Sequence, residues 1–364
     1  MEMLALKAFG GAYRGRRVLV TGHTGFKGSW LCLWLQALGA QVSGVALDPP
    51  SEPSHWDLLK LSLDDDRVDI RDEAALRRVF AARRPEMVFH LAAQPLVRRS
   101  YHEPAATWAT NVMGTVNVLE AVRHTPDVRA VVVVTTDKCY ENREWPWAYR
   151  EHDRLGGHDP YSASKAGTEL AAASYRRALL QHPSAPLLAT ARGGNVIGGG
   201  DWSEDRLIPD LVRAVSAGRP LAIRAPHSTR PWQHVLDCLS GYLLLGQRLL
   251  AGDTHCAEAW NFGPDGDGNR RVEQVVEELA RAWPQLEWHV ATGPAPHEAG
   301  LLQLDSAKAK AQLGWRPVWT VEKAIRHTAD WYRRLLEHGE VSSAADLSAY
   351  VADAADSGLQ WATA

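Results

Sequence analysis

A glycine-rich loop near the start of the chain constrains the fold more than any other feature. Gly22, Gly25 and Gly28 stand three residues apart, between an expected strand at 17–20 and an expected helix at 28–38. Glycine suits such a turn because the chain bends tightly, because the backbone must approach a bound phosphate, and because helix packs closely on strand. The first N–H groups of the helix are unpaired and carry partial positive charge. Strand, loop and helix together predict a dinucleotide site.

The first half of the chain repeats this alternation of apolar strand-like stretches and helical patterns. Such a repeat implies right-handed crossovers and a parallel sheet covered by helices on both faces. The run Val131-Val132-Val133-Val134 fits a strand buried on both sides. We therefore predict an α/β fold, a Rossmann-type doubly wound parallel sheet with a smaller C-terminal substrate-binding α/β domain. The expected strands are 17–20, 42–47, 87–91, 130–135 and 187–191, with helices at 28–38, 73–83, 107–123 and 163–180.

Two aspartates and two alanines are candidates for cofactor contacts, and three of them, Asp48, Ala92 and Ala93, follow further expected strands. Asp48 lies 20 residues beyond the last loop glycine. A carboxylate there accepts from ribose hydroxyls and repels a 2′-phosphate, so, with no Arg or Lys following it closely, it favours NAD over NADP. A turn aspartate ahead of two prolines is the alternative interpretation. Asp69 is expected near the adenine, and Ala92 and Ala93 along the cofactor, whereas His90 is expected to be packed.

Tyr161 and Lys165 stand four residues apart at the start of an expected helix, so they share one helical face. The pKa of a free tyrosine is about 10, too high for a base near neutrality. A lysine cation and the nicotinamide charge are expected to lower it. The pair can then remove a proton from a sugar hydroxyl while hydride leaves for the nicotinamide. Thr136, at the end of the valine-rich strand, is expected to bind the same hydroxyl.

Asp137 and Lys138 directly follow Thr136, at the strand end where open α/β sheets place their chemistry. They form a second acid/base pair, which simple alcohol oxidation does not require. A surface ion pair is the alternative interpretation. Charged groups at strand ends with perturbed pKa values are more often functional.

Composition excludes several classes of protein and of site. The chain has 40 Lys and Arg against 43 Asp and Glu, a net charge of -3, so it has no bulk charge for nucleic acid. The 15 histidines show no H-E-x-x-H pairing, and no metal site is expected. The apolar stretch 235–250 is too short and too polar to span a membrane, and no signal peptide is expected. No C-x-x-C pair occurs among the four scattered cysteines, which fits a reducing cytoplasm.

Several longer stretches, taken together, carry a resemblance to a known family. The chain resembles the extended short-chain dehydrogenase/reductase family, and within it the nucleotide-sugar 4,6-dehydratases, most closely the CDP-glucose group. The resemblance covers residues 13–331. The stretches are Thr21-Gly22-His23-Thr24-Gly25-Phe26-Lys27-Gly28-Ser29-Trp30, Ala92-Ala93-Gln94-Pro95-Leu96-Val97-Arg98, Asp137-Lys138-Cys139-Tyr140, Asn195-Val196-Ile197-Gly198-Gly199-Gly200-Asp201-Trp202 and Arg230-Pro231-Trp232-Gln233-His234-Val235.

The resemblance implies a reaction in three stages on one bound NAD, with CDP-glucose as substrate. The sugar C4 hydroxyl is oxidised, water is lost across C5 and C6, and hydride returns to C6. Tyr161 would be the oxidation base, supported by Lys165 and Thr136, and Asp137 would protonate the departing C6 hydroxyl. Lys138 stands where dTDP-sugar dehydratases carry glutamate, and its role as the C5 base is a hypothesis.

The resemblance also implies the contacts to the cofactor and to the substrate. Gly194 stands where the family pattern leads us to expect alanine, which affects loop stiffness more than chemistry. Each predicted substrate arginine could instead be a solvated surface charge. The cofactor residues are Gly22, Thr24, Gly25, Phe26, Gly28, Asp48, Asp69, Ala92, Ala93, Tyr161 and Lys165. The substrate residues are Gln94, Asn195, Arg206, Arg230 and His297.

The expected domain division follows the change in sequence pattern after residue 191. We predict an NAD-binding domain of 13–193 and 232–264, and a nucleotide-sugar-binding domain of 194–231 and 265–336. Residues 337–364 form a tail, rich in Ala, Ser and Asp, that is expected to be loosely held. A homo-oligomer, either a dimer or a dimer of dimers, is expected. Two alternative functions stay open, a nucleotide-sugar epimerase and a catalytically inactive NAD-binding regulator.

Overall fold

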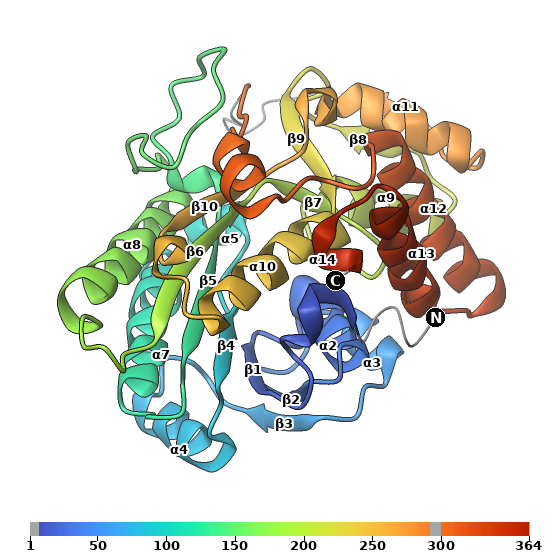
Figure 1. The fold of residues 1–364 in the computed structure, drawn as a ribbon. Coiled ribbons are helices and arrows are strands. Elements are labelled where there is room, and N and C mark those ends of the chain that lie inside the picture. Colours follow the sequence, from blue (N-terminus) through green and yellow to red (C-terminus); the bar gives the residue numbers. More distant parts are fainter. Residues whose placement is uncertain (1–6, 292–299, 364) are drawn as a thin grey trace.

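A seven-stranded sheet forms the centre of the molecule in the computed structural model, which describes residues 7–291 and 300–363 (Figure 1). Every strand pair in it is parallel, and the strand order is β10-β6-β5-β4-β1-β2-β3. The predicted Rossmann-type sheet is therefore confirmed. Its strands are β1 (Arg17–Thr21), β2 (Gln41–Ala46), β3 (Asp64–Arg67), β4 (Met87–His90), β5 (Ala130–Thr136), β6 (Leu187–Gly193) and β10 (Ala259–Phe262).

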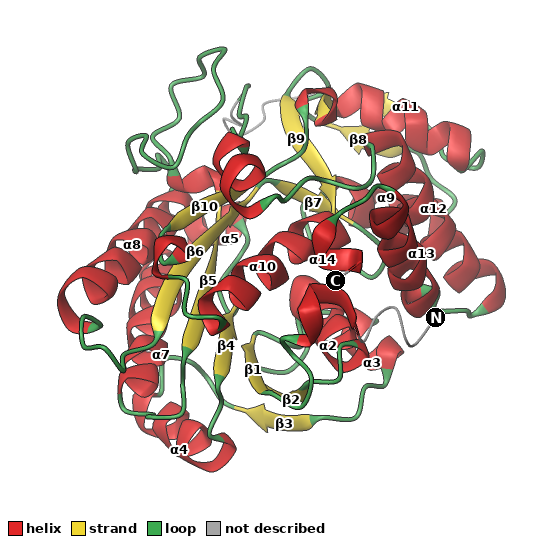
Figure 2. Ribbon diagram, in the orientation of Figure 1, coloured by secondary structure: helices red, strands yellow, loops and turns green. Residues whose placement is uncertain are grey.

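Successive side chains of each strand point to opposite faces, and helices cover both faces (Figure 2). Val131 and Val133 of β5 pack in the cluster with α4 (Glu73–Arg83), α7 (Gly114–Arg123) and α8 (Pro160–Ser174). Val132 and Val134 pack on the other face, against α2 (Phe26–Ala37) and α10 (Val235–Leu250). Burial on both faces explains why this strand is a continuous apolar run. Within the described ranges, none of the helices combines the length and apolar composition needed to cross a bilayer.

Among the strands of the large sheet and the helices that cover it, three elements differ from the prediction. The helix expected at 107–123 begins earlier, as α6 (Pro104–Trp108), and passes through a π-helical turn, η2 (Ala109–Met113), into α7. The helix expected at 163–180 is α8, which begins at Pro160 and ends in a second π-helical turn, η4 (Tyr175–Leu179). Strand β3 was not predicted, because its four residues are all charged. It is the edge strand beside β2, where charged side chains remain in solvent.

The second half of the chain adds a smaller α/β region with an apolar cluster of its own. Two small sheets lie there, and helices pack around them at the upper right of Figure 1. The boundaries of the two domains stay a prediction. The elements of this region are β7 (Asn195–Ile197), α9 (Leu207–Ser216), β8 (Leu221–Ile223), β9 (Thr229–His234), β11 (Asn269–Arg271), α11 (Val272–Ala282), β12 (Trp288–Val290) and α12 (Val321–His338).

Short helical segments connect these larger elements or lie at the ends of the chain. Several of them are single turns of 3-10 or π-helix. They are η1 (Ala8–Gly11), α3 (His55–Leu59), α5 (Val97–His102), η3 (Asp137–Cys139), η5 (Thr254–Cys256), η6 (Gly266–Gly268), η7 (Ala309–Leu313) and α14 (Gln360–Thr363). A longer helix, α13 (Ser343–Asp356), precedes α14.

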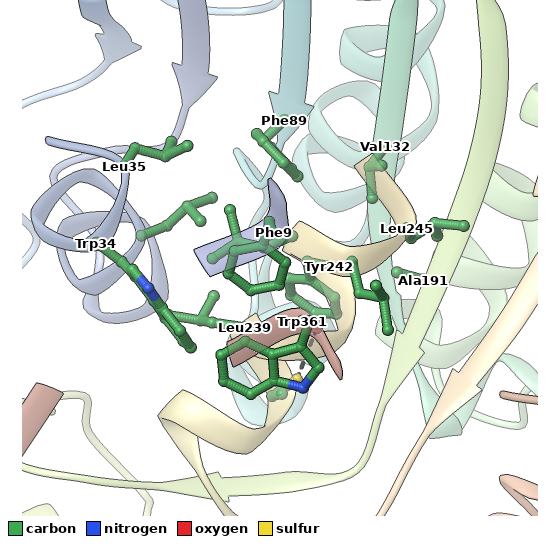
Figure 3. Packing of buried hydrophobic residues seen from close by; sticks show 14 of the residues in the cluster. Phe9, Trp34, Leu35, Phe89, Val132, Ala191, Leu239, Tyr242, Leu245 and Trp361 are labelled. Atoms are coloured by element: carbon green, nitrogen blue, oxygen red, sulfur yellow. Dashed lines mark hydrogen bonds between the residues drawn. The ribbon is translucent and has the colours of Figure 1, made fainter. Parts of the chain in front are cut away.

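The C-terminal segment is packed, so the expectation of a loosely held tail is wrong. α13 and α14 lie against α2 and the N-terminal turn η1. Trp361 is 3% exposed and stacks on Phe9, with ring centroids 4.8 Å apart (Figure 3). The Tyr350 hydroxyl donates a hydrogen bond of 2.8 Å to the buried Asp237 of α10. The small residues that suggested disorder form the outer face of a helix, whose inner face carries Leu347, Tyr350 and Val351.

We expect Trp361→Ala to lower the free energy of unfolding by about 3–5 kcal/mol, because it leaves a cavity between Phe9 and Trp34. Urea denaturation followed by circular dichroism measures the change. Leu336→Ala is the matched control, since Leu336 is 45% exposed on α12 and should change stability by at most about 0.5 kcal/mol. Equal effects of the two substitutions would mean that the C-terminal segment does not contribute to the core.

Candidate active site

The glycine loop brings β1, β4 and α2 closer together than any side chain would permit. Gly22 has φ +76°, and a Cβ there would lie 2.7 Å from the backbone nitrogen of Ala92. A Cβ on Gly28 would lie 2.1 Å from the carbonyl oxygen of Gly22. Gly25 is the N-cap residue of α2, and no side chain caps this helix start. Its first N–H groups are therefore available to an anion, so the loop fits the pyrophosphate of a dinucleotide.

Threonine hydroxyls hold the predicted cofactor segments against this loop. The Thr24 hydroxyl donates to the carbonyl of Leu47 at the end of β2 (3.0 Å). The Thr21 hydroxyl accepts from the backbone N–H of Ala92 (3.2 Å), which positions the segment that continues into Ala93. His90 is buried beside Thr21, and burial lowers its pKa to about 3, so it is packed as expected.

Asp48 and Asp69 lie beside arginines. The Asp48 side chain is 93% exposed, and its carboxylate lies 3.7 Å from the guanidinium of Arg67. No Arg or Lys follows Asp48 closely along the chain, but the pairing of β2 with β3 brings Arg67 beside it from 19 positions away. Asp69 accepts hydrogen bonds from Arg71, which lower its pKa. No described contact joins either aspartate to the glycine loop, so their cofactor roles stay predictions.

Helix α8 presents Tyr161, Lys165 and Glu169 on one buried face. Pro160 occupies the first turn, and the Asp159 side chain accepts from the N–H of Ser162, which determines where the helix begins. Glu169 binds Arg192 of β6 at 2.8 Å, and both side chains are 3% exposed. Glu169 also accepts hydrogen bonds from Thr135 of β5 and Thr190 of β6. This buried ion pair holds the helix on the strands that border the site.

The phenol of Tyr161 meets groups from two other parts of the chain. The hydroxyl of Thr136 and the positive charge of Arg206 both act to lower the pKa of this phenol. Burial nevertheless raises the pKa of Tyr161 to about 12. Burial, together with the charge of Lys27, lowers the pKa of Lys165 to about 8. The expected lowering of the pKa of Tyr161 by Lys165 together with the nicotinamide charge stays a prediction, because in the protein alone burial outweighs the positive charge of Arg206.

Asp137 and Lys138 lie at the same place, at the end of β5. Asp137 is fully buried; one carboxylate oxygen accepts from the Thr136 hydroxyl (2.9 Å), and Lys138 Nζ lies 3.4 Å from the same oxygen. The other oxygen, Oδ2, has no hydrogen-bond partner among the described residues. A buried carboxylate oxygen without a partner is costly, which indicates a ligand group there. The negative charge of Asp137 also reaches Tyr161 and contributes to raising its pKa.

The predicted substrate residues lie in different parts of the structure and have different hydrogen-bond partners. Asn195 accepts from Lys138 Nζ at 3.4 Å, and Arg206, at the N-cap of α9, pairs with Asp201 at 3.1 Å. Arg230 is 9% exposed in β9. The Gln94 side-chain amide hydrogen-bonds with the backbone of Leu96 in its own loop and donates to the hydroxyl of Thr107 on α6. His297 lies outside the described residues.

Sequence reasoning missed three groups that shape this site. Glu169 lies one turn beyond Lys165, so the helical period could have marked it as buried. Arg192, in β6, was not singled out from the sequence, and Lys27 appeared only as a member of the glycine-loop stretch. No local pattern indicates that Lys27 or Arg192 would face α8, because the positions of both side chains depend on the order of the strands.

Comparison with known proteins places this geometry in a family. The family model of GDP-mannose 4,6 dehydratase matches residues 19–328. The CDP-glucose 4,6-dehydratase of Salmonella typhimurium is 47% identical, over 88% of this chain and 91% of that protein. A dTDP-glucose 4,6-dehydratase structure from Streptomyces venezuelae, with NAD bound, has a TM-score of 0.73 and 26% identity over 87% of this chain and 97% of that one.

An epimerase structure from Methanothermobacter thermautotrophicus also has the same fold. Its TM-score is 0.80, with 26% identity, over 92% of this chain and 96% of that one. Fold likeness therefore extends to enzymes of more than one activity. The match of the family model over most of the chain, and the high identity to one dehydratase, show that the chain belongs to the GDP-mannose 4,6 dehydratase family.

Proposed function

We propose that this protein converts CDP-glucose to CDP-4-keto-6-deoxyglucose with NAD, as a hydro-lyase. The observation that carries the proposal is the buried Asp137, whose free oxygen lies in the site of Tyr161. Oxidation of an alcohol needs one base and a hydride acceptor, whereas elimination of water needs a further acid and base. The identity of 47% to a CDP-glucose 4,6-dehydratase supports the choice of substrate.

In this proposal Tyr161 removes the proton of the sugar C4 hydroxyl, and Thr136 orients that hydroxyl. NAD, when bound, supplies the hydride acceptor and a positive ring charge that favours the phenolate. Lys165, buried behind the phenol, donates to the carbonyl of Val134 (3.5 Å) and holds its ammonium near the site. The glycine loop and the Ala92 and Ala93 segment hold the dinucleotide.

Elimination then uses the second pair of groups. Lys138 Nζ lies 3.4 Å from Asp137 Oδ1, so one proton can pass from the ammonium to the carboxylate before elimination. The neutral amine of Lys138 then takes the C5 proton, and the protonated Asp137 gives its proton to the C6 hydroxyl, which leaves as water. Asn195 accepts a hydrogen bond from Lys138 Nζ and so helps to hold the lysine side chain in the site, where the sugar would bind. The hydride taken from C4 returns to C6, so sugar and cofactor show no net oxidation. Arg206 and Arg230 bind the diphosphate by their charge and forked N–H groups.

An epimerase is the alternative with the same fold, and it shares the tyrosine and lysine pair. A regulator without activity has no use for Tyr161, Lys165 and Thr136 in one site. Neither function requires a buried carboxylate at position 137, so the dehydratase is favoured. Product mass separates the two enzymes, since only a dehydratase loses water.

The central test is incubation with NAD and CDP-glucose deuterated at C4. We expect the product to lose one water and to carry the deuterium at C6, measured by mass spectrometry and NMR. A substrate of unchanged mass would overturn the dehydratase assignment. Repeating the reaction with dTDP-glucose measures the choice of nucleotide, and a faster reaction with dTDP-glucose would overturn CDP-glucose as the substrate.

Replacement of Lys138 tests its role as the C5 base. In D₂O we expect that Lys138→Ala no longer incorporates solvent deuterium at C5 of the sugar. Its turnover should fall by roughly 10²- to 10⁴-fold. Oxidation at C4, followed in a single turnover by absorbance of the reduced nicotinamide, should remain. Lys138→Arg keeps the charge beside Asp137 but cannot accept a proton, so it should behave like the alanine variant. Normal exchange at C5 in either variant would contradict the role.

We also propose a homo-oligomer, a dimer or a dimer of dimers, in a reducing cytoplasm. Trp108, Met113 and Leu170 are 43%, 53% and 62% exposed, on the adjoining elements α6, η2 and α8. Aromatic and methionine side chains exposed together are typical of protein interfaces. The four cysteines are buried and unpaired, which supports the compartment.

Sedimentation velocity tests this surface. We expect the protein to sediment as a dimer or larger, and Leu170→Asp to shift it to a monomer, because a charge would be buried in the interface. Leu336→Asp, a similar change at an exposed position of α12, should leave the mass unchanged. If the unmodified protein is monomeric at micromolar concentration, the proposed interface is wrong.

A further inference from the structure

Lys27 extends from the glycine loop toward the ends of the strands that carry the reaction site. It lies in the first turn of α2, and its side chain is half-buried. Its Nζ is 4.0 Å from the sulfur of Cys238 on α10. The same Nζ is 3.6 Å from the position that a Cβ on Gly193 would occupy. The ammonium therefore lies beside the end of β6. In the sheet β6 is three strands away from β1, the strand that leads into the glycine loop.

This position puts Lys27 next to the catalytic side chains. Gly193 pairs with Thr136 in the sheet, so the ammonium is one strand away from the hydroxyl beside Tyr161. The charge of Lys27 contributes, after burial, to the lowered pKa of Lys165. No carboxylate oxygen of the described residues pairs with Lys27 within ion-pairing distance, and its hydrogen bond is to a neutral thiol. Its positive charge is therefore poorly balanced inside the site.

In a doubly wound sheet the two halves of a dinucleotide lie on opposite sides of the point where the strand order reverses. By the strand order of this sheet, β1, β2 and β3 would hold the adenosine half of the cofactor, and β4, β5 and β6 would adjoin the nicotinamide half. The backbone of Lys27 lies in the part of the site that begins at β1, and its ammonium lies beside β6 in the other part. Resting on the proposed use of NAD, we propose that the Lys27 ammonium raises the reduction potential of the bound nicotinamide and so promotes oxidation of the sugar at C4.

The physical reason is the change of ring charge during the reaction. Oxidation breaks the C4–H bond, and the hydride reduces the positively charged ring to a neutral one, while the hydroxyl proton goes to Tyr161. A nearby uncompensated cation disfavours the charged ring and leaves the neutral ring unaffected. In a dehydratase the reduced cofactor must persist until water has left, so an environment that favours it has a clear use.

A different role for Lys27, binding the pyrophosphate, predicts a different result. The oxidised and reduced dinucleotides have the same pyrophosphate, so loss of a phosphate contact weakens both equally. Loss of a cation near the ring strengthens binding of the oxidised form relative to the reduced form. The ratio of the two dissociation constants therefore distinguishes the two roles and does not depend on turnover.

The experiment measures binding of NAD⁺, NADH and ADP-ribose to the full-length protein and to Lys27→Met, Lys27→Gln and Lys27→Arg. We expect the ratio Kd(NAD⁺)/Kd(NADH) to fall about tenfold in the methionine and glutamine variants, which corresponds to about 30 mV for a two-electron couple. Lys27→Arg, which keeps the charge, should stay within about threefold of the unmodified protein. ADP-ribose lacks the nicotinamide, and its Kd should stay within about threefold in all variants.

Lys7→Met is the control for loss of a lysine at an exposed site, and it should leave all three constants unchanged. Thermal melting identifies variants that do not fold, and the methionine and glutamine substitutions differ enough in polarity for one to serve where the other fails. An unchanged ratio in a folded variant overturns the inference, as does equal weakening of all three ligands. If the unmodified protein binds neither NAD⁺ nor NADH, the proposed function itself fails.

Discussion

The buried ion pair between Glu169 and Arg192 supports the rest of the site. Both side chains are 3% exposed, and hydroxyls of Thr135 and Thr190 satisfy the carboxylate further. Removing one partner of such a pair leaves an uncompensated charge in the core, at a cost of about 3–5 kcal/mol. Because Glu169 lies one turn beyond Lys165 and two beyond Tyr161, the pair determines where these side chains meet β5 and β6.

Both positive and negative side chains lie near the place where α8 packs against β5 and β6. The cation of Arg206 lies near the phenol of Tyr161, whose pKa burial raises to about 12. The charge of Lys27 acts on Lys165, one turn further along α8. Asp137 supplies the opposing charge from the end of β5, and one of its oxygens has no partner among the described residues. A site with preformed charges of this kind stabilises changes of charge during reaction without reorganising, because its dipoles and ions are already in place.

Hydrogen bonds of buried serine and histidine side chains connect the cofactor helix to the C-terminal helices. Ser29 of α2 bonds with His55 (2.7 Å), and His55 bonds in turn with Ser343 of α13 (2.8 Å). The indole of Trp30, also on α2, donates to the carbonyl of Gly199 (2.9 Å), near the start of the loop that leads to Arg206. The last helices of the chain therefore help to position the first loop and the substrate region together.

Local patterns in the sequence predicted much of the fold and part of the site. The glycine spacing, the alternation of strands and helices, and the four-residue spacing of Tyr161 and Lys165 all arise from short-range geometry of the backbone. Asp137 was assigned to the same site because carboxyl ends of parallel strands share an edge. Strand β3 and helix α13 were missed, because their formation depends on neighbours in space and not on local apolar periodicity.

The sequence by itself therefore determined which side chains stand at strand ends and on shared helical faces. Tertiary structure alone decided which distant charges meet: Arg67 beside Asp48, Arg192 beside Glu169, and Lys27 beside Lys165. The physical reason is that strand order brings together residues separated by 19 or more positions, and no spacing along the chain encodes that order. The pKa of Tyr161 likewise depends on burial and on Arg206, which lies far away in the sequence, and so it could not be read from neighbours in sequence.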